Sequence, residues 1–272
     1  MQKKQILIDE KVMTYYEYKP LLTSPYQGEE KSVASSLLSK ERIERGPVLV
    51  FLHGWMQDGK SFEKIFKILE EKKIPYVSLD LPWFWGSGLI HDDMNLDDYT
   101  ELTKKFIEKL WLMRPVLLWH SFGGRICINL WSYYENISRI VLLCAAWVQR
   151  KMPFHWYIVI KTGKRILALP GLRSIWSRFR EWLSSPDLKN AGKMTKIFKN
   201  TIAQDIRDKM KLVSYPTLMI WWKDDDQTPV TDAQVIHKHL QNSTLHVLDG
   251  THFVHQERPE EITQLILDFI KV

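Results

Sequence analysis

The stretch V-L-L-W-H-S-F-G-G, residues 116–124, decides the fold. Apolar residues run directly into Ser121, two glycines follow, and an apolar pattern with helical spacing begins at Arg125. This pattern predicts a buried strand, a sharp turn and a helix, with a serine at the apex. A serine in that place exposes its hydroxyl at the end of a sheet, which is the arrangement of a nucleophile elbow. The turn needs small neighbours, so Gly123 fits it and Trp119 conflicts with it.

Strand and helix patterns alternate on both sides of this stretch. An edge hairpin is expected at residues 5–8 and 12–18, buried strands at 47–52, 76–79, 116–119, 140–144, 217–221 and 245–248, and helices at 60–72, 96–110, 124–134, 232–240 and 259–270. This alternation predicts an α/β fold with a mostly parallel, doubly wound sheet. Functional sites in such sheets lie beyond the carboxyl ends of the strands. His53, Asp80 and Ser121 all follow predicted strands directly.

Residues 148–214 break the alternation and carry most of the basic charge. Aromatic-rich helical patterns occupy 154–169, 172–183 and 190–211, without a strand between them. Fifteen Lys or Arg and four Asp or Glu lie between Arg150 and Lys211, a net charge of +11, whereas the rest of the chain carries −5. We therefore expect a helical cap, residues 148–214, inserted into a core of residues 1–147 and 215–272.

Composition narrows the class of protein. Hydrophobic residues make up 45% and charged residues 26% of the 272 residues, which is ordinary globular composition. No apolar run reaches the ~18 residues that a membrane span requires, and the N-terminus has no signal-peptide pattern. Only Cys127 and Cys144 are present, so no disulfide framework is indicated and a cytoplasmic location is expected.

The sequence contains no phosphate-binding loop and no metal-ligand cluster, so neither a cofactor nor a metal is expected. Without a recognition motif beside the basic charge, nucleic-acid binding is not expected either. The basic cap leaves open a contact with an anionic membrane surface, a preference for acidic substrates, or a solvated basic face.

Three polar groups at predicted strand ends form a candidate hydrolytic triad. Ser121 is the candidate nucleophile, and a serine hydroxyl needs an adjacent base. His252, after the last strand, is the candidate base, and an aspartate of the run at residues 224–226 is the candidate acid that fixes the imidazole. The backbone N–H groups of Trp55 and Phe122 are the candidates for the oxyanion hole.

Five landmarks in the same order and spacing resemble the α/β-hydrolase superfamily over nearly the whole chain. They are H-G-W at 53–55, L-D-L-P at 79–82, H-S-F-G-G at 120–124, P-T-L-M-I-W at 216–221 and H-F-V-H-Q-E-R-P-E-E at 252–261. The resemblance implies a Ser-Asp-His triad in that chain order, and it places the acid at Asp225, four residues before Pro229, with Asp224 and Asp226 as alternatives.

The chain departs from that resemblance in one repeated way. Tryptophan stands where the family has glycine at Trp83, Trp85, Trp119, Trp147 and Trp222, and the chain holds 12 Gly and 12 Trp. Average usage would give about 19 glycines. We interpret these tryptophans as UGA codons that the source lineage reads as glycine. TGA at these five codons, with TGG at 55 and 221, would support this interpretation; TGG throughout would contradict it.

The resemblance implies a serine hydrolase acting on a small-molecule ester or related acyl substrate without a cofactor. The same scaffold also hosts C–C bond hydrolases, lyases and cofactor-free haloperoxidases. The alternative is a catalytically weak or non-catalytic binding or signalling protein that keeps the hydrolase shell.

Overall fold

The structure is a computed structural model that describes residues 1–20, 47–84, 87–88, 91, 93–146 and 186–271. Its strands are β1 (Gln2–Ile8), β2 (Lys11–Tyr18), β3 (Leu49–Leu52), β4 (Tyr76–Leu79), β5 (Val116–His120), β6 (Arg139–Leu143), β7 (Thr217–Trp222) and β8 (Ser243–Leu248). Its helices are α2 (Glu63–Glu71), α3 (Leu96–Lys109), α4 (Phe122–Trp131), α7 (Pro186–Asn190), α8 (Thr195–Ala203), α9 (Arg207–Met210), α10 (Val230–His239), α11 (Val254–Glu257) and α12 (Pro259–Lys271), with a short 3-10 turn at Gly192–Met194.

The eight strands form one sheet in the order β1-β2-β4-β3-β5-β6-β7-β8. β1 pairs antiparallel with β2, and β2 antiparallel with β4, whereas every other pair is parallel. The predicted edge hairpin and the mostly parallel sheet are therefore confirmed. β5 lies between β3 and β6, so Ser121 follows a central strand.

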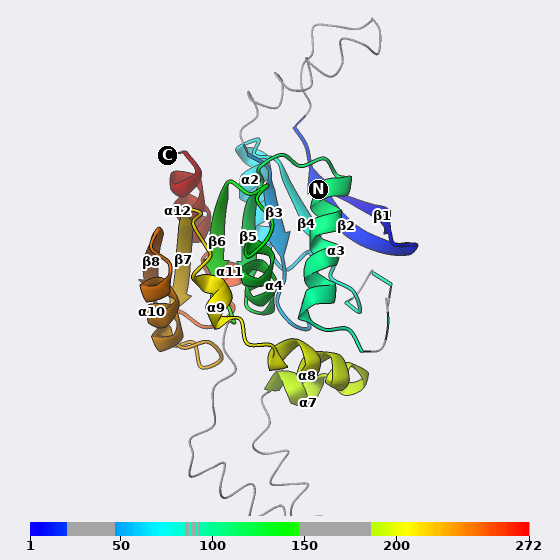
Figure 1. Ribbon diagram of the computed structural model, residues 1–272. Coiled ribbons are helices and arrows are strands. Elements are labelled where there is room, and N and C mark those ends of the chain that lie inside the picture. Colours follow the sequence, from blue (N-terminus) through cyan, green and yellow to red (C-terminus); the bar gives the residue numbers. More distant parts are fainter. Residues whose placement is uncertain (21–46, 85–86, 89–90, 92, 147–185, 272) are drawn as a thin grey trace, which may run out of the picture.

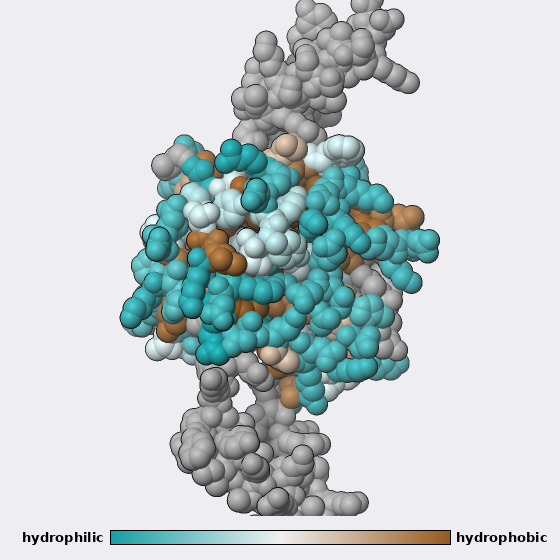
Figure 2. Space-filling model, in the orientation of Figure 1, coloured by the Kyte–Doolittle hydropathy of each residue, from teal (hydrophilic) through white to brown (hydrophobic). Residues whose placement is uncertain are grey.

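Helices cover both faces of the sheet, as expected for a doubly wound fold (Figure 1). α3 packs on α4 over one face, and α2 packs on α12 over the other. The strands β3, β4, β5 and β7 are buried along their whole length, which explains their continuous apolar sequences. Hydrophilic side chains cover most of the face seen in Figure 2, with small apolar areas between them.

α7 and α8 lie beyond the carboxyl ends of the strands, below the sheet in Figure 1. They belong to the predicted cap. The expected helices at 154–169 and 172–183 lie outside the described residues, so the cap boundaries stay a prediction. The helical pattern expected at 190–211 is present in the structure as a short 3-10 turn, α8 and α9, with breaks between them. Gly192 adopts a left-handed backbone with φ +49, and Gln204 is extended with ψ 126, so neither continues an α-helix.

α4 begins at Phe122, two residues earlier than the sequence pattern indicated. The turn is therefore as short as a strand-to-helix connection can be, because Ser121 alone separates β5 from α4. No helix in the described part of the chain has the length and apolar character to cross a membrane.

Candidate active site

Ser121 has a strained backbone that the surrounding structure holds in place. Its φ is 49 and its ψ is −113, a region that non-glycine residues rarely adopt. Its N–H donates to the Leu143 carbonyl at 3.0 Å, and its carbonyl accepts from the N–H groups of Gly124 and Ala146, each at 2.9 Å. These bonds fix the serine between β5, the end of β6 and the first turn of α4.

The two glycines after Ser121 allow α4 to approach the sheet closely. A Cβ on Gly123 would lie 2.9 Å from the Leu52 carbonyl oxygen, and a Cβ on Gly124 would lie 2.3 Å from the Cβ of Ala145. Both distances are shorter than van der Waals contact. The sequence G-G is therefore required by packing, and it places the helix N-terminus directly behind the serine.

His252 and Asp225 form a buried hydrogen-bonded pair. Asp225 Oδ2 lies 2.7 Å from His252 Nδ1, and the two residues are 4% exposed each. Asp224 and Asp226, the neighbouring carboxylates, are exposed. Of the three aspartates, Asp225 is thus the one that the structure brings to the histidine.

Further donors surround the Asp225 carboxylate. The N–H groups of Gln227 and Thr228 lie 2.9 and 2.8 Å from Oδ1, and the Thr228 hydroxyl donates to Oδ2 at 2.8 Å. Burial by itself would raise the pKa of Asp225, but His252, the Thr228 N–H and the Cys144 thiol outweigh it and lower that pKa. The acid is therefore ionised and oriented toward the imidazole.

Sequence reasoning did not assign Thr228 a role. The spacing D-x-x-T could have indicated this role, because a threonine three residues after an aspartate can form a hydrogen bond to the carboxylate within one turn.

His120 supports His252 from the strand side. His120 Nε2 lies 3.0 Å from the His252 carbonyl oxygen, and His120 Nδ1 lies 3.1 Å from Gln57 Oε1. Burial, followed by the neighbouring histidines, lowers the pKa of His120 well below its ordinary value. A neutral ring carries a single N–H, so His120 can donate to only one of these two oxygens at a time.

Ser121 and His252 line the same small pocket, together with Asp187, Gln227 and Phe253. The free volume beside them is about 20 Å³, which is close to the room that one water occupies. Within the described part of the chain, the Ser121 hydroxyl makes no hydrogen bond to His252. Such catalytic bonds are often long in ligand-free sites and shorten when substrate binds.

Trp55, one of the two candidates for the oxyanion hole, lines this pocket, and Phe122, the other, directly follows Ser121. Phe122 is the first residue of α4, so its N–H has no acceptor within the helix and lies at the positive end of the helix dipole. The rings of Trp55 and Phe122 stack edge to face at 5.3 Å, which holds the two segments together.

His53 fixes the loop that carries Trp55. Its Nε2 accepts from the Leu81 N–H at 3.0 Å, and its Nδ1 lies 2.8 Å from the Gly54 carbonyl oxygen. Burial lowers the pKa of His53 to about 4, so the ring is neutral and serves as an anchor.

Among the described residues, Cys144, Asp225 and His252 have ligand atoms within 4.8 Å of one another. Asp225 and His252 already bond to each other, and burial keeps the pKa of the Cys144 thiol well above its ordinary value. A metal site needs a thiolate and free lone pairs. This donor set is therefore arranged for a hydrogen-bonded acid and base, and it does not fit a metal.

Three of the five anomalous tryptophans lie within the described residues, and Trp85 and Trp147 lie outside them. Trp83 has φ 71. Trp119 and Trp222 are fully buried, and their indole N–H groups have no partner among the described residues. Trp221 differs, because its indole donates to the Thr228 carbonyl at 2.7 Å. Trp55 also lacks an indole partner. The left-handed backbone of Trp83 suits glycine, and Trp111, which is not one of the five, shares it with φ 53.

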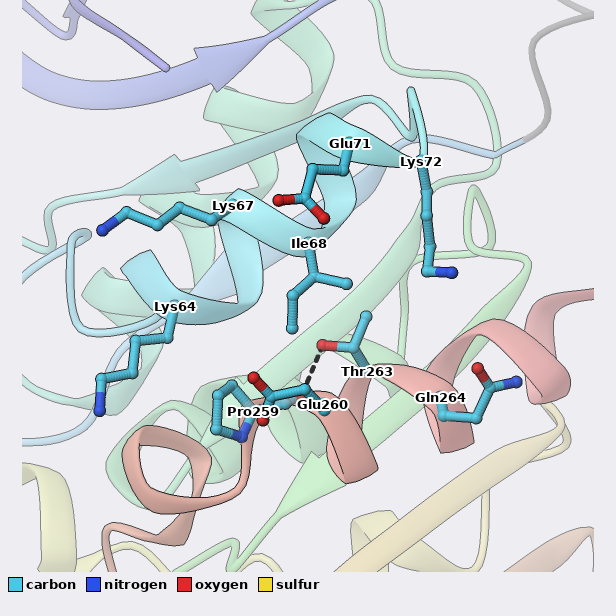
Figure 3. A pocket seen from close by; sticks show the side chains of 9 residues that line it. All are labelled: Lys64, Lys67, Ile68, Glu71, Lys72, Pro259, Glu260, Thr263 and Gln264. Atoms are coloured by element: carbon cyan, nitrogen blue, oxygen red, sulfur yellow. Dashed lines mark hydrogen bonds between the residues drawn. The ribbon is translucent and has the colours of Figure 1, made fainter.

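A separate hollow of about 500 Å³ lies between α2 and α12. Figure 3 shows that its rim carries lysines and glutamates of both signs, from Lys64 and Glu71 to Glu260, around the apolar Ile68. Lys64 already bonds to the Gln256 carbonyl at 2.6 Å. The hollow contains none of the candidate triad residues.

Comparison with known proteins gives a consistent result. The family model described as "Alpha/beta hydrolase family" matches residues 49–265. The uncharacterized hydrolase YugF of Bacillus subtilis is 31% identical over 248 residues, covering 82% of this chain and 89% of that protein. Monoacylglycerol lipase ABHD6 of Homo sapiens is 24% identical over 254 residues, covering 82% and 75%. The crystal structure of a bromoperoxidase from Bacillus anthracis superposes with a TM-score of 0.72 at 18% identity, covering 100% of each chain.

Proposed function

Because the chain belongs to the α/β hydrolase family, we propose that it is a serine hydrolase that cleaves small esters through Ser121, His252 and Asp225. The main support for this proposal is the hydrogen-bonded pair of Asp225 and His252. His252 lines the same pocket as Ser121, which lies on a strained turn between β5 and α4. A relative named for its lipase activity supports an ester as the substrate class.

The mechanism follows from the atoms at the site. His252 Nδ1 is held by Asp225, so Nε2 is the nitrogen free to take the proton of the Ser121 hydroxyl. The serine oxygen attacks the ester carbonyl, and the N–H groups of Trp55 and Phe122 receive the oxyanion. The alcohol leaves with the proton from His252. A water molecule, deprotonated by His252, then attacks the acyl-serine; the acyl–oxygen bond breaks, the acid leaves, and His252 returns the proton to the Ser121 oxygen.

A panel of 4-nitrophenyl esters from acetyl to dodecanoyl tests the proposal and reports the acyl length. We expect turnover that falls by a factor of ~10⁴ or more in Ser121→Ala. Ser132→Ala, at the other end of α4, is the matched control and should retain the activity. Equal turnover by the parent chain and Ser121→Ala would refute the role of the serine.

A non-catalytic binding or signalling role is the second candidate. Within the described part of the chain, the Ser121 hydroxyl makes no hydrogen bond to His252 although both residues line one pocket, and a serine that stays apart from its base is not activated. Calorimetry separates the two functions: saturable binding of an ester without turnover, by a folded chain, would support the binding protein.

The proposal includes a small-molecule acyl substrate and a cytoplasmic location. The two cysteines, Cys127 and Cys144, are buried free thiols, as suits a reducing compartment. Contact of the basic cap with an anionic membrane surface stays a prediction, and binding of the chain to vesicles of anionic phospholipid would test it.

A further inference from the structure

Asp187 brings a carboxyl group from the cap side into the candidate active site. It is the second residue of α7, and its side chain lines the pocket that Ser121 and His252 share. The side chain is half-buried. Burial raises the pKa of the Asp187 carboxyl, and the nearby His252 opposes that rise. Asp187 therefore borders the candidate reaction space and stays partly exposed to solvent.

The described lining of this pocket contains no lysine or arginine. Within the described part of the chain, Asp187 has no hydrogen-bond or ion-pair partner, and the candidate base His252 is already paired with Asp225. A half-buried carboxylate without a partner is costly, and a bound cation would offset that cost. The basic side chains that follow on the cap, Lys189, Lys193 and Lys196, are exposed and do not line the pocket.

Two aromatic residues belong to the same pocket lining as Asp187. Trp55 and Phe253 line the same pocket, and Phe253 is 42% exposed. An alkylated ammonium group is attracted both by a carboxylate and by aromatic faces. Apart from Asp187 and two histidines, the described lining of the pocket carries no ionisable side chain.

We propose that Asp187 is a specificity-determining residue that selects esters bearing an ammonium group close to the scissile carbonyl. The inference rests on the proposed function and names the substrate class for the same site. It also opposes the expectation of acidic substrates that the charge of the whole cap suggests, because the residue at the site has the opposite sign. In the reaction the ester C–O bond breaks, the acyl group passes to Ser121, and the alcohol takes the proton from His252.

Two pairs of isosteric esters test the inference. Acetylcholine and 3,3-dimethylbutyl acetate differ by a cation on the alcohol side, and ethyl betaine and ethyl 3,3-dimethylbutanoate differ by a cation on the acyl side. The measured quantity is the ratio of kcat/KM for the charged and the neutral member of each pair. The intrinsic chemical reactivity of each ester is the same for every variant, so it cancels when the ratio is compared between variants.

We expect the ratio of at least one pair to fall about tenfold in Asp187→Asn, the scale of one partly solvated charge pair, and further in Asp187→Lys. Asp208→Asn removes an exposed carboxylate of α9 and should leave the ratio unchanged. Ratios that are unchanged in Asp187→Asn for both pairs would overturn the inference, as would turnover of 4-nitrophenyl acetate with none of either charged ester. A parent chain that hydrolyses none of these esters would refute the proposed function itself, and the inference with it.

Discussion

At the scale of single residues, Thr228 is a test of how the acid is positioned. Its hydroxyl donates to the same Asp225 oxygen that bonds to His252. Thr228→Val keeps the shape and removes this donor, so Asp225 should hold the imidazole less firmly. We expect kcat for ester hydrolysis to fall about tenfold, equivalent to ~1.4 kcal/mol, with little change in KM.

Thr228→Ser is the matched control, because it keeps the hydroxyl and loses only a methyl group. It should retain most of the activity that Thr228→Val loses. Equal kcat in the two variants would show that the hydroxyl does not position Asp225.

Trp83 tests the interpretation that glycine belongs at the anomalous tryptophan positions. Its φ of 71 lies in the left-handed region, where a side chain costs roughly 1–2 kcal/mol and glycine costs little. Trp83→Gly and Trp83→Ala both remove the indole ring. The loss of packing is therefore nearly the same in the two variants and cancels when their stabilities are compared. We expect Trp83→Gly to be the more stable by ~1 kcal/mol in urea unfolding. An alanine variant of equal or greater stability would contradict a glycine-requiring backbone.

At the scale of elements, the contact of α4 with the segment after β6 sets the position of Ser121. A Cβ on Gly124 would lie 2.3 Å from the Ala145 Cβ. Gly124→Ala should therefore destabilise the protein by ~1–3 kcal/mol through overpacking. The double variant Gly124→Ala with Ala145→Gly moves the methyl group across the contact and should recover most of this loss in thermal unfolding. If the double variant is no more stable than Gly124→Ala, the contact between residues 124 and 145 is not the cause of the destabilisation.

The sheet could be predicted from the sequence because its signal is local. β4 was predicted at its observed bounds, since a short apolar run buried on both faces can be recognised by itself. The helical pattern at 190–211 did not reveal the breaks at Gly192 and Gln204, because these depend on backbone angles and contacts that periodicity does not report.

The residues of the candidate site also fall into those that the sequence indicates and those that only the structure reveals. Ser121 and His252 follow strand patterns, so the sequence indicates where they lie. The choice of Asp225 among three adjacent aspartates came from the resemblance, and the structure shows which of them bonds to His252. Asp187 was not singled out, because it lies 66 positions after the nucleophile and reaches the pocket by tertiary packing alone. Long-range contacts of this kind leave no periodic pattern.

At the scale of the whole molecule, buried histidines make stability depend on pH. Burial lowers the pKa of His255 to about 3 and that of His53 to about 4, below the ordinary value of 6.5. Below about pH 6.5 these histidines bind protons in the unfolded chain, whereas in the native protein they stay neutral down to their lowered pKa values. The free energy of unfolding therefore decreases as the pH falls from about 6.5 toward those values. Asp80 acts in the opposite direction, because burial raises its pKa to about 6.

His255 isolates this effect, since both of its ring nitrogens are buried without a partner among the described residues. Between about pH 7 and pH 5, the parent chain should lose ~2 kcal/mol more unfolding free energy than His255→Leu. The Asp80 contribution is common to both chains and cancels. His239→Leu, at an exposed position, should follow the parent chain. Parallel stability curves for the parent and His255→Leu would contradict the assignment of a neutral buried ring.

The central claim is that Ser121 is the catalytic nucleophile of this protein. Formation of a covalent adduct on Ser121 tests this claim most directly. Folded chain, made both as printed and with glycine at the five anomalous tryptophans, is treated with a fluorophosphonate and its peptides are mapped by mass spectrometry. We predict one phosphonyl adduct, on Ser121, that is absent from Ser121→Ala and slowed in His252→Ala. Folded protein of both versions that acquires no adduct, or an adduct that persists in Ser121→Ala, would contradict the claim.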